Sequence, residues 1–371
     1  MSLDETIRTE ARALGFDRVG YCDAALPEEA GHFQRWLDAG MHGTMEWMRR
    51  GRERRLNPGL ILPGTRSLIM VARSYALPTA IDAPGEPPPG SGAIARYARG
   101  EDYHRVMGDK LQALADFVEA SASGHRALSY VDTGAVLERM WAARAGIGWV
   151  GKNALVLNKD MGSWFFLGAI LTTLPLPPDE PALDQCGSCA LCIEACPTQA
   201  IVAPRLVDSR LCISYHTIEL RGDVPEQHRA AAGAWVFGCD DCQDACPWNR
   251  RPAAGERRPN AGEQRVSHHD ASAEQDPSLV ALLEMTHEEY LRRFRRSAVR
   301  RATWQGLRRN AAIVLGNRLS RMEEPDRADA LRALARVAGD PTESAVVRSH
   351  ATWALAHAAA MIDSTSRTSA S

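Results

Sequence analysis

The chain has 371 residues, of which 45% are hydrophobic, and its formal net charge is -2. This length and apolar content exclude a small scaffold held together by disulfides, and they predict two or three domains with a substantial core. The near-zero charge excludes binding of an anionic polymer through overall charge, so such binding needs a local basic patch. Residues 1–20 lack an apolar signal core and no apolar run approaches about 18 residues, so we expect a cytoplasmic protein without a membrane span.

The first region, residues 1–180, alternates helical and strand-like patterns. Helical patterns cover residues 4–14, 28–39, 102–122 and 135–145. Runs of β-branched or aromatic residues cover residues 18–21, 68–75, 127–132, 154–158 and 164–174. This alternation predicts a layered α/β or α+β domain. Residues 84–92, rich in Pro and Gly, are expected to form a loop inside it.

The second region, residues 181–250, holds most of the cysteines. Eight of the nine lie between Cys186 and Cys246, and Cys22 stands alone. In a chain without a secretory signal, this clustering favours metal binding over disulfides.

The remainder of the chain is a linker followed by helices. Residues 251–277 are polar and rich in Arg and Ala, and this predicts an exposed linker. Residues 278–362 are helical in pattern, and Arg309–Asn317 (RNAAIVLGN) is echoed 40 residues later by Ser349–His357 (SHATWALAH). The echo predicts HEAT-like helical repeats. The Ser- and Thr-rich residues 363–371 predict a disordered tail.

The spacing of the cysteines is typical of bacterial ferredoxins. In the run Cys186-x2-Cys189-x2-Cys192-x3-Cys196-Pro197, three thiolates can reach one cubane and the fourth ligates a second cluster. A second run ends in another Cys-Pro but lacks its first cysteine, whose place Cys212 takes. We therefore assign one 4Fe-4S cluster to Cys186, Cys189, Cys192 and Cys246, and the other to Cys196, Cys212, Cys239 and Cys242. Two four-cysteine zinc sites are the alternative, which the spacing and the two prolines disfavour.

A glycine-rich segment, residues 146–153 (GIGWVGKN), matches G-x-G-x-x-G and nearly matches G-x-x-x-x-G-K-[ST]. Both phosphate-binding motifs need a strand before the loop and a helix after it. Here the predicted helix comes first and the strand follows, and Asn153 replaces the hydroxyl residue that holds magnesium. The segment therefore predicts no nucleotide site.

Five short motifs carry a family resemblance: residues 131–134 (VDTG), Glu138-Arg139, residues 144–153 (RAGIGWVGKN), residues 162–167 (GSWFFL) and residues 238–249 (GCDDCQDACPWN). Together they resemble the epoxyqueuosine reductase family. The resemblance implies an α+β chain with an N-terminal cobalamin-type domain, a ferredoxin-like two-cluster domain and a helical C-terminus. It also implies reduction of epoxyqueuosine at the tRNA wobble position to queuosine. No side chain can supply the two electrons, so cofactors must, and the family's are cobalamin and two 4Fe-4S clusters.

The resemblance also implies a set of cobalamin-binding residues. By position in the family these are Arg55, Ala95, Asp132, Val156, Leu167 and Ser214, with Lys152 and Asn153 nearby. Core packing is the alternative for the apolar members. Asp102-x-His104 resembles the start of a cobalt-ligating D-x-H-x-x-G motif, but the glycine falls one position late and the segment is helical in pattern. We therefore expect an ordinary helical histidine and no protein axial ligand.

Asp132 is our candidate general acid. It follows an apolar strand and precedes Thr133-Gly134, and the resemblance in VDTG favours catalysis. Desolvation beneath a corrin ring is expected to raise the pKa of its carboxyl, so that it can protonate the oxygen released from the epoxide. The alternative is that Asp132 caps the following helix.

For partners, we expect tRNA, bound at its anticodon loop through arginines. Residues 292–301 (RRFRRSAVRR) hold six arginines, and Arg250, Arg251, Arg257 and Arg258 add more. The alternative is an ordinary solvated surface, because the chain uses only three lysines and prefers arginine throughout. A flavodoxin or ferredoxin is the expected type of reductant, and a monomer the expected state.

Three other functions remain open at this stage. A cobalamin-dependent reductive dehalogenase shares the cofactors, but that class resembles exported proteins with a twin-arginine signal, and Arg49-Arg50 here is internal. A ferredoxin-type electron carrier needs only the cysteine region. A helical-repeat interaction protein explains the C-terminal part alone.

Overall fold

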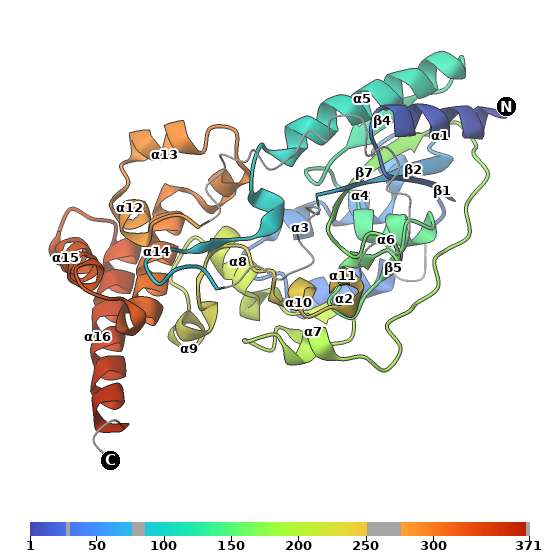
Figure 1. Ribbon diagram of the computed structural model, residues 1–371. Coiled ribbons are helices and arrows are strands. Elements are labelled where there is room, and N and C mark those ends of the chain that lie inside the picture. Colours follow the sequence, from blue (N-terminus) through green and yellow to red (C-terminus); the bar gives the residue numbers. More distant parts are fainter. Residues whose placement is uncertain (27–29, 76–85, 251–275, 369–371) are drawn as a thin grey trace.

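A four-stranded antiparallel sheet lies at the centre of the N-terminal region in the computed structural model (Figure 1). The structure describes residues 1–26, 30–75, 86–250 and 276–368, the last seven of these by their backbone alone. In spatial order the strands are β1 (Arg18–Asp23), β2 (Ser67–Ser74), β7 (Phe165–Thr172) and β4 (Ala127–Tyr130).

Helices and shorter strands surround this sheet. In the N-terminal region they are α1 (Leu3–Ala13), α2 (Ala30–Asp38), α3 (Glu46–Arg50), α4 (Arg52–Leu56), β3 (Ala93–Ile94), α5 (Tyr103–Ser121), α6 (Glu138–Arg144), β5 (Trp149–Val150) and β6 (Val156–Leu157). In the cysteine region they are α7 (Leu191–Glu194), β8 (Ile201–Ala203), β9 (Leu206–Val207), α8 (Ile213–Ile218), α9 (Glu226–Arg229), β10 (Trp235–Phe237), α10 (Asp241–Asp244) and α11 (Pro247–Arg250). The C-terminal helices are α12 (Leu279–Glu284), α13 (His287–Arg293), α14 (Trp304–Arg318), α15 (Asp326–Gly339) and α16 (Ala345–Thr368).

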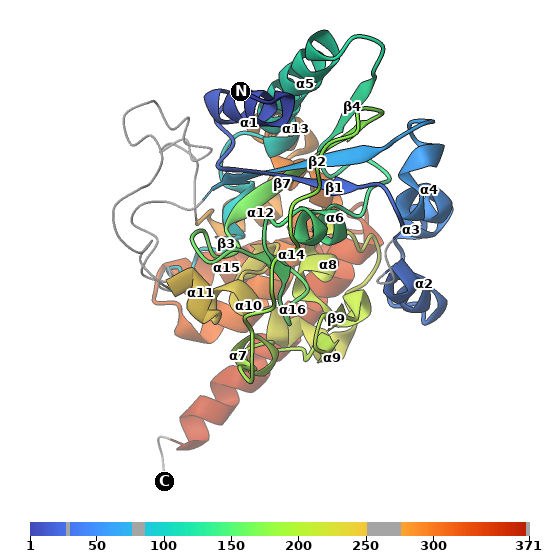
Figure 2. The same ribbon diagram turned by 90° about the vertical axis from the view of Figure 1, so that its right-hand side faces the viewer.

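Strand β2 sends its side chains alternately into two helical layers, because successive residues of a strand point to opposite faces. Ile69 and Val71 pack in the hydrophobic cluster that includes α1 and α5. Leu68 and Met70 pack instead with Trp141 of α6. Figure 2 shows α1 and α5 on one side of the sheet and α6 on the other. The predicted mixed α/β layering is confirmed, with an antiparallel sheet at its centre.

Around the glycine-rich segment, the order of elements is the one expected from the sequence. Helix α6 precedes the glycines, strand β5 lies between Gly148 and Gly151, and its hairpin partner β6 follows them. The predicted strand at residues 154–158 is shorter than expected, since only Val156–Leu157 is paired. Short helices α3 and α4 were not predicted.

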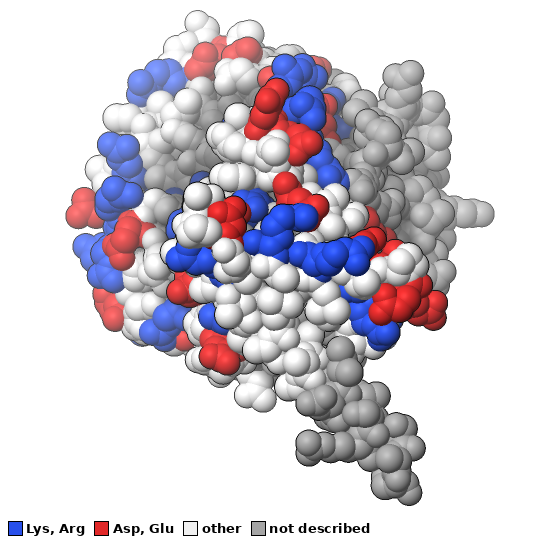
Figure 3. Space-filling model, turned by 90° about the vertical axis from the view of Figure 1, so that its left-hand side faces the viewer, with Lys and Arg blue, Asp and Glu red and all other residues white. Residues whose placement is uncertain are grey.

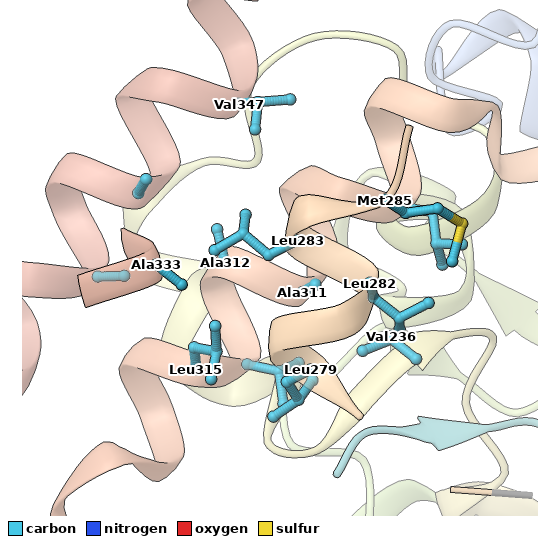
Figure 4. Packing of buried hydrophobic residues seen from close by; sticks show 14 of the residues in the cluster. Val236, Leu279, Leu282, Leu283, Met285, Ala311, Ala312, Leu315, Ala333 and Val347 are labelled. Carbon is cyan, nitrogen blue, oxygen red and sulfur yellow. The ribbon is translucent and has the colours of Figure 1, made fainter. Parts of the chain in front are cut away.

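The C-terminal helices share one core with segments from both earlier regions. Leu279, Leu282 and Leu283 of α12 pack with Leu315 of α14 and Val236 of β10 (Figure 4). Nearly every side chain of α14 is buried, because helices α12 and α16 and strand β10 pack against it. A helix in this position must be apolar or hydrogen-bonded on all sides.

Part of the N-terminal sequence belongs structurally to this helical core. Strand β3 pairs in parallel with β10, and Ile94 and Ala98 are buried among the C-terminal helices. The guanidinium of Arg318 binds Glu86 at 2.6 Å and donates to the carbonyl of Pro89 at 3.2 Å. The three sequence regions therefore pack into one another rather than following one another as separate domains.

The C-terminus departs from the predicted disordered tail. Helix α16 continues through residues 363–368, and only residues 369–371 fall outside the described chain. Most of the predicted linker, residues 251–275, also lies outside the described residues, and so do Arg251, Arg257 and Arg258. Within the part of the chain that the structure describes, we find no helix that is long and apolar enough to cross a membrane.

Candidate active site and cluster cavities

Four cysteines from two separate runs line one cavity of about 210 Å³: Cys186, Cys189, Cys192 and Cys246. Cys186 and Cys189 come from a loop, in which the Cys189 amide donates to the Cys186 carbonyl at 3.1 Å, and Cys192 comes from helix α7 that follows it. Gly187 adopts a left-handed φ of 51° there, a conformation that glycine adopts without strain. Cys246 arrives at the end of α10, so the cavity joins the two cysteine runs as the first cluster assignment requires.

The other four cysteines also influence one another electrostatically. Burial is the first cause that raises the pKa of the Cys212, Cys239 and Cys242 thiols, and neighbouring cysteines raise it further. Cys196 is among these neighbours for Cys212 and Cys242. Thiols in such a group cannot all ionise unaided, and bound iron would displace their protons.

Lys152 and Asn153 border the first cluster cavity. The Lys152 ammonium donates to the carbonyls of Gly187 and Cys189 at 2.7 and 2.8 Å. The Asn153 amide lies 3.5 Å from the Cys242 carbonyl. Both side chains therefore contact the cysteine segments, and their contact with cobalamin stays a prediction.

Asp132 lies in an exposed bend between β4 and α6. Its side chain is 64% exposed, and its backbone has a left-handed φ of 55°, which is uncommon for a residue other than glycine. Helix α6 begins only at Glu138, with Leu137 in the capping position. Asp132 therefore caps no helix, and the capping alternative is wrong.

Two neighbours on α5 hold the Asp132 carboxylate. The Tyr103 hydroxyl donates to its Oδ2 at 2.8 Å, and His104 Nε2 lies 3.3 Å from the same oxygen. On the other side of the ring, His104 Nδ1 lies 2.6 Å from Asp102 Oδ1. Asp102 is itself fixed because it caps α5 and accepts from the His104 amide. The result is a carboxylate–imidazole–carboxylate chain that ends at the exposed loop.

The hydrogen bonds between Asp102, His104 and Asp132 decide where a proton resides. Burial acts to raise the pKa of Asp132, but hydrogen bonds from His104 and Tyr103 outweigh it and lower the pKa below its usual value. Burial acts to lower the pKa of His104, yet Asp102 and Asp132 raise it to about 9. Near neutral pH the proton therefore resides on His104. The expected rise in the pKa of Asp132 beneath a corrin ring stays a prediction.

A second carboxyl near Asp132 does have a raised pKa. Burial, and then the charge of Asp132, raise the pKa of Glu138 to about 7. Its Oε1 has no hydrogen-bond partner within the described residues, and the same holds for the Nε of buried Arg55. Arg55 also donates to the Gly134 carbonyl at 3.1 Å, so it supports the Asp132 loop from behind. The sequence analysis missed Tyr103, His104 and Glu138 in these roles; the Asp102-x-His104 and Glu138-Arg139 motifs were the available signals.

The remaining predicted cobalamin residues differ in accessibility. Ala95 is buried beside Gly238, where a Cβ on the glycine would lie 2.4 Å from the Ala95 Cβ. Val156 is buried in the cluster with Trp141, so its side chain serves the core. Leu167 and Ser214 are half-buried. The unpartnered donor of Arg55 and acceptor of Glu138 fit a ligand such as a corrinoid, whose amide groups both accept and donate.

Comparison with known proteins supports the assignment of the clusters. The family described as 4Fe-4S double cluster binding domain matches residues 185–249, which include all eight clustered cysteines. That match favours iron–sulfur clusters over the zinc alternative. The family described as Epoxyqueuosine reductase QueG, DUF1730, matches residues 55–133, a range that ends just beyond Asp132.

Relatives and solved structures match most of the chain. An epoxyqueuosine reductase from Gloeobacter violaceus is 46% identical over 317 residues, covering 84% of this chain and 95% of that protein. A crystal structure of epoxyqueuosine reductase with an epoxyqueuosine-modified tRNA-Tyr stem loop is 29% identical with a TM-score of 0.81. A Bacillus subtilis epoxyqueuosine reductase, with the loop of its catalytic aspartate swung out of the active site, is 28% identical with a TM-score of 0.82. Both structural alignments cover 96% of this chain and 90% of the other.

Proposed function

The chain belongs to the epoxyqueuosine reductase family, and we propose that it reduces epoxyqueuosine in tRNA to queuosine with two 4Fe-4S clusters and cobalamin as its cofactors. The observation that carries this proposal is the pairing, in one chain, of an eight-cysteine cluster region with an exposed carboxylate on a hydrogen-bonded proton chain. The cysteine region can hold electron carriers, and the Asp132 loop can hold protons.

The reaction needs both electrons and protons. Converting an epoxide to an alkene breaks two C–O bonds, consumes two electrons and two protons, and releases the oxygen as water. Bound cobalamin would supply a cobalt centre that is nucleophilic towards carbon when reduced. Arg55, Glu138 and the Asp132 loop are the residues we expect to contact it, with Ser214 and Leu167 at its periphery.

We infer that Asp132 delivers protons to the departing oxygen. An alkoxide is far more basic than a carboxylate, so it takes a proton from any acid within hydrogen-bond reach. Asp132 is itself ionised near neutral pH, so the proton that it passes to the oxygen comes from His104, which holds one. Glu138, with a pKa of about 7, is a second source near the same loop. Two such sources suit a reaction that consumes two protons.

The Asp132→Asn variant tests this role. Asn keeps the size and can still accept from Tyr103, but it has no carboxylic proton to give. We expect cobalamin content and iron content to match the wild type, while conversion of an epoxyqueuosine-containing stem loop falls by roughly 10²-fold or more. Nucleoside analysis of the product measures the conversion.

The control for this experiment is Asp109→Asn, an exposed carboxylate on the same helix as Tyr103. It should convert the stem loop at the wild-type rate. Near-normal turnover by Asp132→Asn would contradict the proton-donor role. A wild-type protein that leaves epoxyqueuosine unchanged would contradict the proposed function itself.

For the tRNA, we infer that the arginines at residues 292–301 contribute phosphate contacts. All six are exposed, on the end of α13 and the turn that follows it. Over the face that carries the C-terminal helices, basic and acidic side chains lie interspersed (Figure 3). A dense run of arginines is therefore more distinctive here than the total number of basic residues.

Other parts of the proposal follow from the substrate and the fold. Helices α14 and α16 pack together through the two echoed segments, with Gly316 against Ala354, and we infer that they form a HEAT-like repeat pair. Because tRNA is the substrate, we place the enzyme in the cytoplasm. We expect it to work as a monomer that receives electrons from a flavodoxin or ferredoxin.

A further inference from the structure

A second cavity, of about 270 Å³, lies beside the Asp132 loop and has no role in the chemistry described so far. Segments far apart in the sequence line it. Thr44, Met45 and Trp47 come from the turn before α3 and from α3 itself, and Glu219, Arg221 and Arg301 come from the C-terminal end of α8 and the turn after α13.

Trp47 is the unusual member of this lining. Its side chain is large and apolar, yet the residue is 39% exposed. The guanidinium carbon of Arg55 lies 5.3 Å from the centre of the Trp47 rings, and that of Arg301 lies 5.8 Å away. A partly exposed aromatic ring with cations over it suits a ligand that combines planar bases with negative charge.

Positive charge extends from this cavity along both of its walls. The segment 49–54 carries exposed side chains of Arg49, Arg50, Arg52 and Arg54. On the other wall lies Arg301, the last member of the arginine run at residues 292–301, which Glu219 fixes through two contacts of 2.9 Å. A polyanion crossing the cavity would meet arginines on each side.

The cavity is also linked to the Asp132 loop. Arg55, which contacts the Trp47 ring, donates to the Gly134 carbonyl within that loop. The pKa of Arg301 is raised first by its hydrogen bonds to Glu219 and also by the charge of Asp132, so the two residues lie within electrostatic range. Arg55 therefore joins the Trp47 ring to the loop that carries Asp132.

We propose that Trp47 is a stacking platform for an unpaired base of the RNA substrate, next in sequence to the base on which Asp132 acts. This inference rests on the proposed function for the identity of the RNA. Single-stranded nucleic acid is commonly held by a basic groove combined with aromatic faces, and both are present here. Stacking tolerates any base, so this contact contributes affinity and register rather than sequence choice.

Substitution of Trp47 tests the proposal by RNA binding, measured by fluorescence anisotropy with an unmodified anticodon stem loop. Loss of one stacked base is expected to weaken binding by about 5- to 150-fold in Trp47→Ala. Trp47→Phe and Trp47→Tyr should bind within a few-fold of the wild type. Leu60→Ala, which removes an exposed apolar side chain just after α4, should change nothing.

Three other results would overturn the proposal. Wild-type RNA affinity in Trp47→Ala is the first of these. Full affinity in Trp47→Leu is the second, because it would show that bulk rather than an aromatic face matters. A loss of cobalamin with unchanged RNA affinity would instead make Trp47 a support for Arg55 and the cofactor. Failure of the proposed function is seen separately, as absence of queuosine formation by the wild-type enzyme.

Discussion

The cysteine region and the Asp132 region are assembled in different ways. Most cysteines of the first cavity come from one short loop, residues 186–192, whose spacing can be read directly from the chain. The Asp132 constellation draws on α5, on the β4–α6 loop and on α4, so its members meet only after folding. A site built from one loop is visible in a sequence, whereas a site built between layers is visible only in part.

The Cys212→Ala variant tests the cysteine region where local spacing helps least. Cys212 stands outside both Cys-x2-Cys runs, and its assignment depends on the count of ligands alone. If it ligates the second cluster, its loss should lower the iron content from about eight atoms to about four and abolish turnover.

Cys22→Ala is the matched control for that experiment, because Cys22 lies in strand β1 and is buried in the core cluster with Trp141. It should keep about eight irons. A Cys212→Ala protein with its full iron content would show that another residue completes the second cluster. The ligands of the cysteine region could then not be assigned from the sequence alone.

The pH dependence of turnover tests the proton chain of the Asp132 region. His104 has an ordinary pKa of 6.5, raised here to about 9. Wild-type turnover should hold through neutral pH and fall as the pH rises through about 9, when His104 loses its proton. His104→Gln should be slower by roughly 10-fold or more at pH 7 and should lack this alkaline decline.

The raised pKa of His104 also makes the stability of the folded protein depend on pH. A raised folded-state pKa means that the native state binds the proton more tightly than the unfolded chain does. The contribution is fully present below about pH 6.5 and is lost as the pH rises through about 9. If the turnover of His104→Gln still falls in the same way at alkaline pH, another group causes the decline and His104 is an ordinary helical residue.

Much of the fold could be predicted from the sequence, and the reasons are local. Strand β2 was recognised because its apolar residues are nearly continuous, and α5 because its apolar residues recur at helical spacing. The interlocking of β3 with β10 was missed, since two-residue strands carry no periodic signal. The segment 363–368 was predicted to be disordered from its composition, yet it continues α16.

The candidate site follows the same division. Asp132 was found through its motif, but the two hydrogen bonds from α5 that lower the pKa of its carboxyl were not foreseen. His104 was discounted as an ordinary helical residue because its helix could not be placed against the loop. Which groups share a proton depends on distances across layers, and no spacing along the chain encodes these.

Lys152 offers the smallest expected effect and the most direct test of where the two regions meet. Family resemblance places it near cobalamin, whereas its ammonium contacts two carbonyls of the first cluster loop. Removing a positive charge there favours the oxidised cluster, so Lys152→Met should lower its reduction potential by on the order of 30 mV, as expected for one charge in a solvent-exposed setting. Lys152→Arg keeps the charge and should shift the potential less. A redox titration followed by electron paramagnetic resonance measures both variants. If the potential stays constant while cobalamin content falls, Lys152 serves the corrinoid, and the sequence position was the better guide.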